Sequence, residues 1–338
     1  MVDIGDEFFY KNVIDMYPDD ESDDDFLTEA ALLIHEHNVA LPGVLAGTRP
    51  GLGSQKITWP RHALLRLLPL QQDNVHGADV SPLFSDVQTI VRPDNGWRQD
   101  EYVRMSESGC LEAMYRFCRA VIAVFGKEFL RQPTAEDTSL LLSINASRGF
   151  SGMLGSIDCM HLQWENFPFG RQGSYKGRSE GCTVILDAAA SRETWIWHSF
   201  FGMAGSHNDI NVLQRSPVFD RLAHGQSPDM DFEINGHHYN KGYYLADGIY
   251  PPWAPLVKTI CRPSSEKEAG FAKEHEASRK DVERAFGILQ SRWTIVRHPA
   301  RAWSVQTMWK VITDCVIMYN MIVEVERDDS LFDNDWEG

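Results

Sequence analysis

Two aspartates lie where the sequence could place a divalent metal ion. Asp158 is inside the apolar, strand-forming run GSIDCM, and Asp247 directly follows the run YYLA. A carboxylate at the carboxyl end of a strand points toward the crevice where open α/β sheets bind ligands. Carboxylate oxygens, water and substrate phosphate are the ligands that Mg²⁺ prefers. If the two strands are neighbours, the aspartates can share such an ion, and a two-metal site then needs a third carboxylate.

Glu283 is the best candidate for the third carboxylate. The segment SRKDVERAFGILQSRW has an apolar stripe, which is typical of a helix that packs by one face. The stripe consists of Val282, Phe286, Leu289 and Trp293. Glu283 lies beside the stripe and can therefore reach over the end of a sheet. The residues alone leave other interpretations open, since each aspartate could be a turn residue and Glu283 could pair with Arg279 or Lys280 on a solvated face.

The elements around these residues follow from the hydrophobic pattern. Residues 106–126 repeat apolar positions at three- and four-residue steps, which predicts an amphipathic helix that ends at Gly126. After Pro133, Thr134 and Asp137 have the spacing of a capping box and begin a second helix. Three apolar runs then predict consecutive strands in an antiparallel meander. They cover residues 153–164, 181–190 and 194–202.

The second half of the chain predicts a helix, two short strands and two long helices. These elements cover residues 208–217, 242–248, 254–261, 274–293 and 305–326. Pro217 would end the first of them. The predicted fold class is therefore α/β, with a mixed central sheet flanked by helices and a helical region before it.

Composition excludes several classes of protein. The chain has 338 residues, of which 43% are hydrophobic and 24% charged, so it is expected to be globular. No stretch approaches the roughly 20 apolar residues of a membrane span, and the N-terminus is acidic, unlike a signal or transit peptide. The six cysteines lie far apart with no C-x-x-C pair, which argues against a structural zinc site or a disulfide scaffold.

The net charge of −16 is confined to the two ends of the chain. Residues 1–30 contain eleven Asp and Glu and one Lys, a balance of −10, and residues 324–338 contain seven and one Arg, a balance of −6. The residues between them carry 30 basic and 30 acidic side chains and are neutral. Acidic blocks of this kind are usually solvated tails, so the overall charge does not argue against a nucleic-acid partner.

Four segments together resemble the catalytic domain of plant Harbinger/PIF-type DDE transposases and related transposon-derived nucleases. They are GSIDCMH, WIWHSFFGMAGSHNDINVLQRSPVF, YYLADGIYPPWAPLVKTI and RKDVERAFGILQSRWTIVRHPAR, and the similarity covers roughly residues 101–327. The resemblance implies an RNase H-like fold in which the first strand ends in a catalytic aspartate, the fourth strand carries a second, and a following helix supplies a glutamate. Asp158, Asp247 and Glu283 match these three positions.

The resemblance also implies an activity and a cofactor. The three carboxylates would hold two Mg²⁺ ions, with Mn²⁺ as a substitute, and cleave DNA phosphodiester bonds by a two-metal mechanism. Composition and the resemblance together predict four regions: an acidic and largely disordered leader (1–60), a helical N-terminal region with a degenerate helix-turn-helix-like portion (61–150), the catalytic domain (151–325) and an acidic tail (326–338). Residues 1 to about 95 do not match the family.

Further site residues are weaker candidates. The family resemblance brings the turn of His207, Asn208 and Asp209 near the active site, whereas by its residues alone Asp209 could cap a helix. Asp187 is expected at the end of the second strand, as a turn residue or as a group behind the metal ligands. His237 and His238 lie beside the turn signature Asn-Gly and are expected in an exposed loop rather than at a metal. Seven cations could contact phosphates: Arg171, Lys176, Arg178, Arg279, Lys280, Arg284 and Arg292.

The resemblance points to DNA, as transposon ends or target DNA, and to the nucleus. It leaves two other partners open, a Myb-like DNA-binding protein and a second copy of the chain. An alternative function is a catalytically silent, host-adopted nuclear protein that keeps the fold and binds a Myb-like or chromatin partner. Retention of the three carboxylates favours the nuclease, and the unmatched N-terminus favours the alternative.

Overall fold

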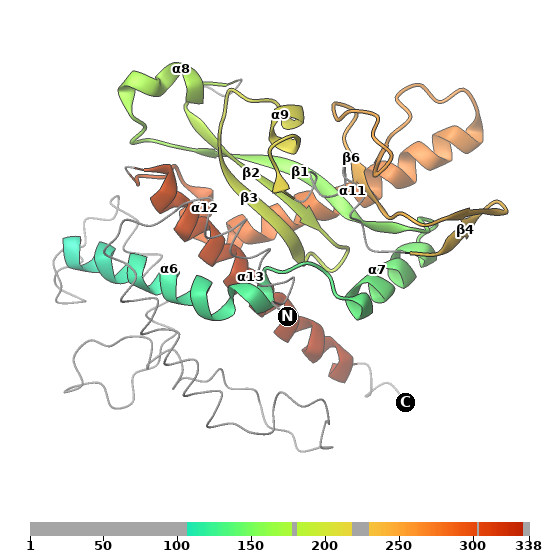
Figure 1. Cartoon of the computed structure of the whole chain (residues 1–338), viewed down its shortest axis with the longest axis horizontal. Helices are drawn as coiled ribbons and strands as arrows, with labels where there is room; N and C mark the ends of the chain where they lie inside the picture. Colours follow the sequence, from blue (N-terminus) through green and yellow to red (C-terminus); the bar gives the residue numbers. More distant parts are fainter. Residues whose placement is uncertain (1–106, 178–180, 218–229, 303, 334–338) are drawn as a thin grey trace, which may run out of the picture.

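The computed structural model describes residues 107–333, apart from 178–180, 218–229 and 303 (Figure 1). The expected leader (1–60), the first part of the expected N-terminal region and the last residues of the acidic tail lie outside the described residues, as does Arg178. Among the described helices, none has the length and apolar character that crossing a membrane requires.

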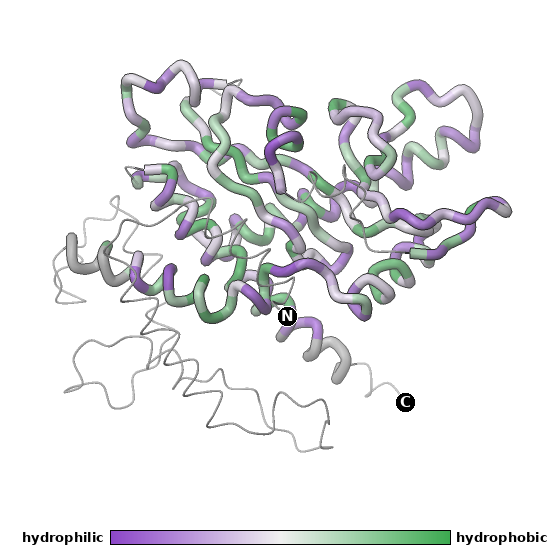
Figure 2. Tube along the Cα trace, viewed as in Figure 1, coloured by the Kyte–Doolittle hydropathy of each residue, from purple (hydrophilic) through white to green (hydrophobic). Residues whose placement is uncertain are grey.

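A mixed sheet of five strands forms the centre of the described protein, with strand order β3-β2-β1-β6-β7. Its strands are β1 (Met153–Gln163), β2 (Thr183–Ala190), β3 (Ile196–Ala204), β6 (Tyr243–Ala246) and β7 (Leu256–Lys258). The first three are antiparallel neighbours, which confirms the predicted meander, and β6 and β7 run parallel to β1. Figure 2 shows apolar residues concentrated on the central strands.

Three long helices cover one face of this sheet: α6 (Glu107–Phe129), α11 (Glu266–Arg292) and α13 (Val305–Asp333). The stripe predicted for residues 274–293 is buried there, because Val282, Phe286, Leu289 and Trp293 all belong to the largest hydrophobic cluster. The opposite face carries the short helix α9 (Asp209–Leu213) and smaller clusters around Leu213 and Val212. Helix α12 (Thr294–Arg297) continues from α11.

The two helices before the sheet share its core. Helix α6 packs along α13, and α7 (Ala135–Ser147) packs on β1, where the Asn145 side chain donates to Met153 O at 2.9 Å. The capping box of Thr134 and Asp137 is present as predicted. The prediction that the first helix ends at Gly126 is wrong, since α6 runs to Phe129. Burial of Phe129 against Trp195 offsets the roughly 1 kcal/mol that a glycine costs inside a helix.

Three other elements differ from the pattern-based expectation. The helix expected over 208–217 is reduced to the five residues of α9. A hairpin of β4 (Phe232–Ile234) and β5 (His237–Tyr239) is joined by Asn235 and Gly236, both at positive φ, so the expected turn is confirmed. The two adjacent histidines are exposed as expected but lie in β5 rather than in a loop. Helix α13 continues to Asp333, so the expected acidic tail begins inside a helix.

Candidate active site between strands β1 and β6 and helix α11

Asp158 and Asp247 hold equivalent places on two neighbouring parallel strands. Ser156 of β1 is in register with Leu245 of β6, and each aspartate comes two residues later. Side chains two residues apart on a strand point to the same face. Ser156 and Leu245 both face α11, since Ser156 Oγ accepts a hydrogen bond from Val282 N at 3.0 Å and Leu245 shares a cluster with a residue of that helix. Asp158 is therefore directed toward α11, whereas Asp247 directly follows the end of β6 and interacts electrostatically with Arg279 of that helix.

The interpretation of Asp158 as the end of the first strand needs correction. Strand β1 continues to Gln163, five residues further. Among the described strands these residues pair with β2 alone, because β6 ends at Ala246; on the other side of β1, Ala300 N donates to Gln163 O at 2.7 Å. Asp158 thus lies where β1 loses one neighbour, a position that opens its carboxylate to groups from both faces of the sheet.

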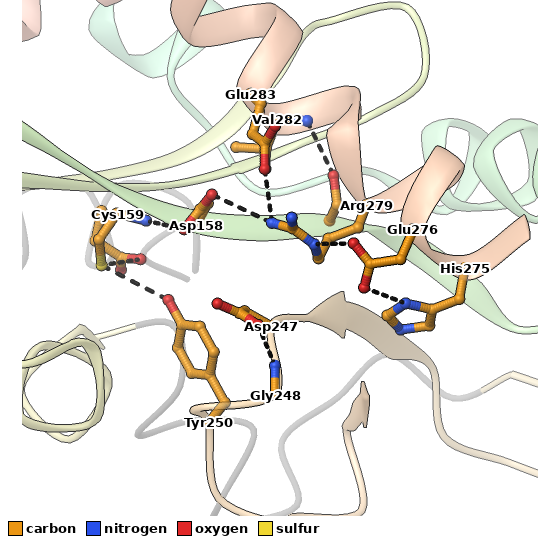
Figure 3. A network of polar contacts seen from close by, with 12 residues as sticks. Asp158, Cys159, Asp247, Gly248, Tyr250, His275, Glu276, Arg279, Val282 and Glu283 are labelled. Atoms are coloured by element: carbon orange, nitrogen blue, oxygen red, sulfur yellow. Dashed lines mark hydrogen bonds and ion pairs between the residues drawn. The ribbon is translucent and has the colours of Figure 1, made fainter. Parts of the chain in front are cut away.

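Glu283 approaches the aspartates from helix α11. The helix is docked on the sheet by Val282 N and by His275, whose Nε2–H donates to Val257 O of β7 at 2.9 Å. Glu283 follows Val282 and is about two-fifths exposed at the edge of the packed face. Figure 3 shows Asp158, Asp247 and Glu283 converging from β1, from the end of β6 and from α11. The structure therefore brings the three predicted residues together.

Arg279 occupies the centre of this cluster. Its Nη1 lies 2.8 Å from Glu283 Oε1 and 3.5 Å from Asp158 Oδ2, and its Nε lies 3.4 Å from Glu276 Oε2 (Figure 3). The ion pair with Glu283 is the one that a solvated helix face would form, but the same guanidinium also reaches a second predicted ligand. Burial disfavours the charge of Arg279, yet the surrounding carboxylates outweigh it and raise the pKa of the guanidinium.

Burial dominates the electrostatics of Asp158. Desolvation raises the pKa of its carboxyl group from 3.8 to about 6. The backbone N–H of Cys159, which donates to Asp158 Oδ1 at 2.8 Å, and Arg279 act in the opposite direction, while Glu283 and Asp209 add to the rise. Near neutral pH, Asp158 is therefore an anion in an environment that favours a nearby cation.

Asp209 is a fourth carboxylate near the site. It does not cap helix α9, because the Asn208 side chain does so by accepting from Asn211 N at 2.9 Å. Asp209 is the first residue of the helix, half-buried, and burial raises its pKa; His161 and Cys159 oppose the rise, and Asp247 and Asp187 add to it. His207 holds the preceding turn through a contact of its Nδ1 with Ala204 O at 2.9 Å. The alternative that Asp209 is the helix cap is therefore wrong.

Asp187 is not a turn residue at the end of a strand. It lies in the middle of β2, opposite Cys159 of β1, and is 1% exposed. Its Oδ1 accepts a long contact from Cys159 Sγ at 3.8 Å, and its Oδ2 lies 3.6 Å from His198 Nε2. Cys159 Sγ also lies 3.6 Å from the hydroxyl of Tyr250. Asp187 therefore belongs to a buried polar group with Cys159 and His198, and the interpretation as a turn residue is wrong.

The turn after β6 contains features that the sequence did not reveal. The backbone N–H of Gly248 donates to Asp247 Oδ1, and Lys258 Nζ of β7 donates to Gly248 O at 3.1 Å and to Tyr250 O at 2.8 Å. Lys258 thus fixes the turn that presents Asp247. A lysine inside the apolar run APLVKTI was an available signal, whereas nothing in the sequence distinguished Tyr250.

The candidate phosphate-binding cations fall into two groups. Arg284 pairs with Asp281 and donates to Arg192 O, and Arg292 pairs with Glu326, so these two have structural partners away from the carboxylates. Arg171, Lys176 and Lys280 are exposed. Arg279 alone of the described candidates contacts the predicted metal ligands.

The chemistry of the donor set suits a hard divalent cation. Asp158, Asp247 and Glu283 offer carboxylate oxygens, and Asp158 combines burial with a bound guanidinium. Within the described ranges, no three His, Cys, Asp or Glu side chains already stand close enough together to hold an ion. The guanidinium of Arg279 takes the place between Asp158 and Glu283.

Comparison with known proteins identifies the ancestry of the chain. It matches a family described as plant transposon protein over residues 127–330, more than half of its 338 residues. The matched segment includes Asp158, Asp247 and Glu283. No curated protein and no solved structure matches the chain. Its resemblance to transposon-encoded proteins is thus confirmed at the level of the family, and the chain belongs to the plant transposon protein family.

Proposed function

We propose that the chain is a divalent-metal-dependent DDE endonuclease or transposase of the Harbinger type, with an RNase H-like catalytic fold. The observation that carries the proposal is the convergence of Asp158, Asp247 and Glu283 from β1, the end of β6 and α11. Strand β6 is the fourth strand of the central sheet in chain order, and α11 is the next long helix. The resemblance to DDE transposases requires this arrangement of strands and helix.

The three carboxylates would hold Mg²⁺ or Mn²⁺, with two ions expected. When bound, such ions stabilise the attacking and leaving oxygens of an in-line displacement at a phosphodiester bond. The residues of the chain have separate tasks. The β1–β6 register fixes the two aspartates relative to each other, and Lys258 holds the turn that presents Asp247. Arg279 pairs with Asp158 and Glu283 and would contact the phosphate of a bound substrate.

Calorimetric titration with Mn²⁺ and Mg²⁺ tests the proposal when it is followed by a plasmid-nicking assay on the same samples. The wild type is expected to bind metal and nick DNA, and Asp247→Asn is expected to lose both. Glu274→Gln is a matched control, because Glu274 is an exposed carboxylate on the same helix as Glu283. Metal-independent nicking, or equal nicking by wild type and Asp247→Asn, would refute the proposed site.

A second candidate function is a catalytically silent nuclear protein that binds a Myb-like or chromatin partner. The observation that favours it is Arg279, which compensates Asp158 and Glu283 without any metal. The titration separates the two candidates, because the silent protein is expected to bind neither Mn²⁺ nor Mg²⁺.

Both candidates place the protein in the nucleus, and the nuclease also takes DNA as its substrate. A fluorescent fusion of the full chain is expected to accumulate in plant nuclei. Co-precipitation with a Myb-like protein and light scattering of the purified chain test the other two partners, a Myb-like protein and a second copy of the chain. Exclusion of the fusion from nuclei would contradict the localisation for both candidates.

A further inference from the structure

The loop between β1 and β2 exposes an aromatic ring that the fold does not use. Phe169 is 83% exposed, the highest value among the exposed large hydrophobic residues of the described chain. Two other aromatic residues of the loop, Phe167 and Tyr175, pack against the main hydrophobic cluster. Full burial of a phenylalanine contributes about 1.5–3 kcal/mol; Phe167 gains part of this by its partial burial, whereas Phe169 gains little.

The loop is held in place on both sides of this ring. On one side the Trp164 ring meets Tyr175 edge-on with centroids 5.0 Å apart, and Trp164 Nε1–H donates to Ala302 O at 2.7 Å. Around the ring, Phe169 and Arg171 form a short 3-10 turn that leads into helix α8 (Gln172–Tyr175). The outward position of Phe169 is therefore set by an anchored loop.

The surface around Phe169 is basic. Residues 166–177 contain Arg171 and Lys176 and no Asp or Glu. Both side chains are exposed, and neither forms an ion pair with any described residue. The nearest acidic residue in the chain, Glu165, is paired with Arg301 at 2.8 Å. An exposed ring followed by two exposed cations that pair with no described residue has the chemistry of a single-stranded nucleic-acid surface, where bases stack on aromatic side chains and cations contact phosphates.

The same loop adjoins the candidate active site. Ser174 O accepts a hydrogen bond from Ser206 N at 3.3 Å, and Gly177 lies so close to Gly205 O that a Cβ at that glycine would come within 2.1 Å of it. This contact joins the loop to the turn that carries Asp209. In Figure 1, α8 and α9 lie at the same edge of the molecule.

The length of β1 gives the approximate distance between the β1–β2 loop and Asp158. Strand β1 extends from Asp158 to Gln163, and Trp164 follows it, which corresponds to about 20 Å at 3.3 Å per residue. One strand of DNA advances 3.4 Å per nucleotide, so the loop is roughly six nucleotides from a phosphate held at Asp158.

We propose that the β1–β2 loop is a binding site for unpaired nucleotides of the DNA strand beside the cleavage position, with Phe169 stacking on a base and Arg171 and Lys176 contacting phosphates. The inference rests on the proposed function in one respect, since it takes DNA as the ligand. It adds a surface to which nothing in the family match assigns a role, and it predicts a preference for DNA with a single-stranded segment over a blunt duplex.

Fluorescence anisotropy with the full chain in the presence of a chelator tests this preference. The two probes are a blunt duplex and the same duplex with a single-stranded overhang of about eight nucleotides. Phe169→Ala is expected to bind the overhang probe about tenfold more weakly than the wild type and the blunt probe equally well, whereas Phe169→Tyr keeps the wild-type affinity. Leu140→Ala is the control, because Leu140 is an exposed leucine on α7, 51% accessible, and is expected to change neither affinity.

The two cations give a second readout. Arg171→Gln and Lys176→Gln are each expected to weaken binding to the overhang probe and to lower, for that probe, the slope of log affinity against log salt by about one. Lys267→Gln, an exposed lysine at the start of α11, is expected to leave that slope unchanged.

Three results would overturn the inference. The first is that Phe169→Ala binds the overhang probe as tightly as the wild type does. The second is that Phe169→Ala loses the same affinity for the blunt probe as for the overhang probe. The third is that the wild type binds no DNA. Because the assay contains no free metal, its outcome is separate from that of the nuclease. If the protein prefers the overhang probe through Phe169 but does not nick DNA, this inference is supported and the nuclease function is refuted. If the protein nicks DNA but shows no preference that depends on Phe169, only this inference is refuted.

Discussion

At the scale of single residues, the candidate site is a group of carboxylates stabilised by one guanidinium. Arg279 contacts Asp158, Glu276 and Glu283 and is itself mostly buried. Asp158 has the larger desolvation cost, because its side chain is less exposed than that of Glu283. The stability of the metal-free protein and the metal binding that we propose therefore depend on the same few charges, and their geometry leads to two predictions.

Replacing Asp158 by asparagine should change how stability depends on pH. The folded carboxyl group has a pKa near 6 against 3.8 for the unfolded chain, so its contribution to stability is complete below about pH 4 and is lost as the pH rises through 6. Without metal, Asp158→Asn should therefore exceed the wild type in free energy of unfolding by about 1–3 kcal/mol at pH 7 and match it near pH 4. Urea unfolding across this range measures the difference. Glu276→Gln, which removes an exposed partner of Arg279, should not show this pH profile.

Replacing Arg279 by glutamine should strengthen metal binding and weaken the metal-free fold. The guanidinium lies where a divalent cation would contact Asp158 and Glu283, so its removal eliminates both competition and charge repulsion. We expect Mn²⁺ affinity to rise several-fold by calorimetry and the free energy of unfolding without metal to fall by about 1–2 kcal/mol. Arg284→Gln is the control, since Arg284 pairs with Asp281 instead, and should leave metal affinity unchanged. Unchanged or weaker Mn²⁺ binding by Arg279→Gln would contradict the competition.

At the scale of elements, the sheet and its helices are joined by a few buried polar side chains as well as by the hydrophobic core. Ser156 joins β1 to α11, and His275 joins α11 to β7. Asn145 joins α7 to β1, and Asn320 of α13 bonds to both β3 and α6. Because each contact pairs a side chain with a specific backbone group, it fixes the position of a helix along the sheet more narrowly than apolar packing does.

Asn320 offers the clearest test at this scale. It is fully buried; its Oδ1 accepts from Ile196 N at 2.9 Å, and its Nδ2 donates to Ile196 O at 2.8 Å and to Phe129 O at 2.6 Å. Asn320→Ala leaves three buried backbone groups without these partners, so we expect a loss of about 2–4 kcal/mol in the free energy of unfolding. Chemical denaturation measures it, and Met318→Ala, a half-buried change on the same helix, should cost less. If Asn320→Ala lowers the free energy of unfolding no more than Met318→Ala does, the proposed role of Asn320 in connecting α13 to β3 and α6 is contradicted.

At the scale of the whole molecule, charge is unevenly distributed. The net charge of −16 comes from the two ends of the chain, and the residues between them are neutral. A neutral body gains little affinity for DNA from counterion release, so DNA binding must depend on local groups of cations. The β1–β2 loop has two exposed cations that pair with no described residue, and it is the group that we propose for this role.

Much of the fold could be read from the sequence because its signals are local. The antiparallel meander, the capping box at Thr134 and the two long helices near the C-terminus follow from periodicity and capping chemistry. The end of α6 could not be read, because the packing of Phe129 overrides the helix-ending tendency of Gly126. The short β4–β5 strands were also missed, since three-residue strands leave almost no periodic signal.

The sequence by itself determined the residue types of the site and their attachment to a strand, a strand end and an amphipathic helix. Only the tertiary structure decided which groups face them: the parallel register of β1 and β6, Arg279 between Asp158 and Glu283, and Lys258 behind Asp247. The physical reason is that periodicity and capping act over a few neighbouring residues, whereas burial, charge compensation and strand register depend on segments far apart in the chain.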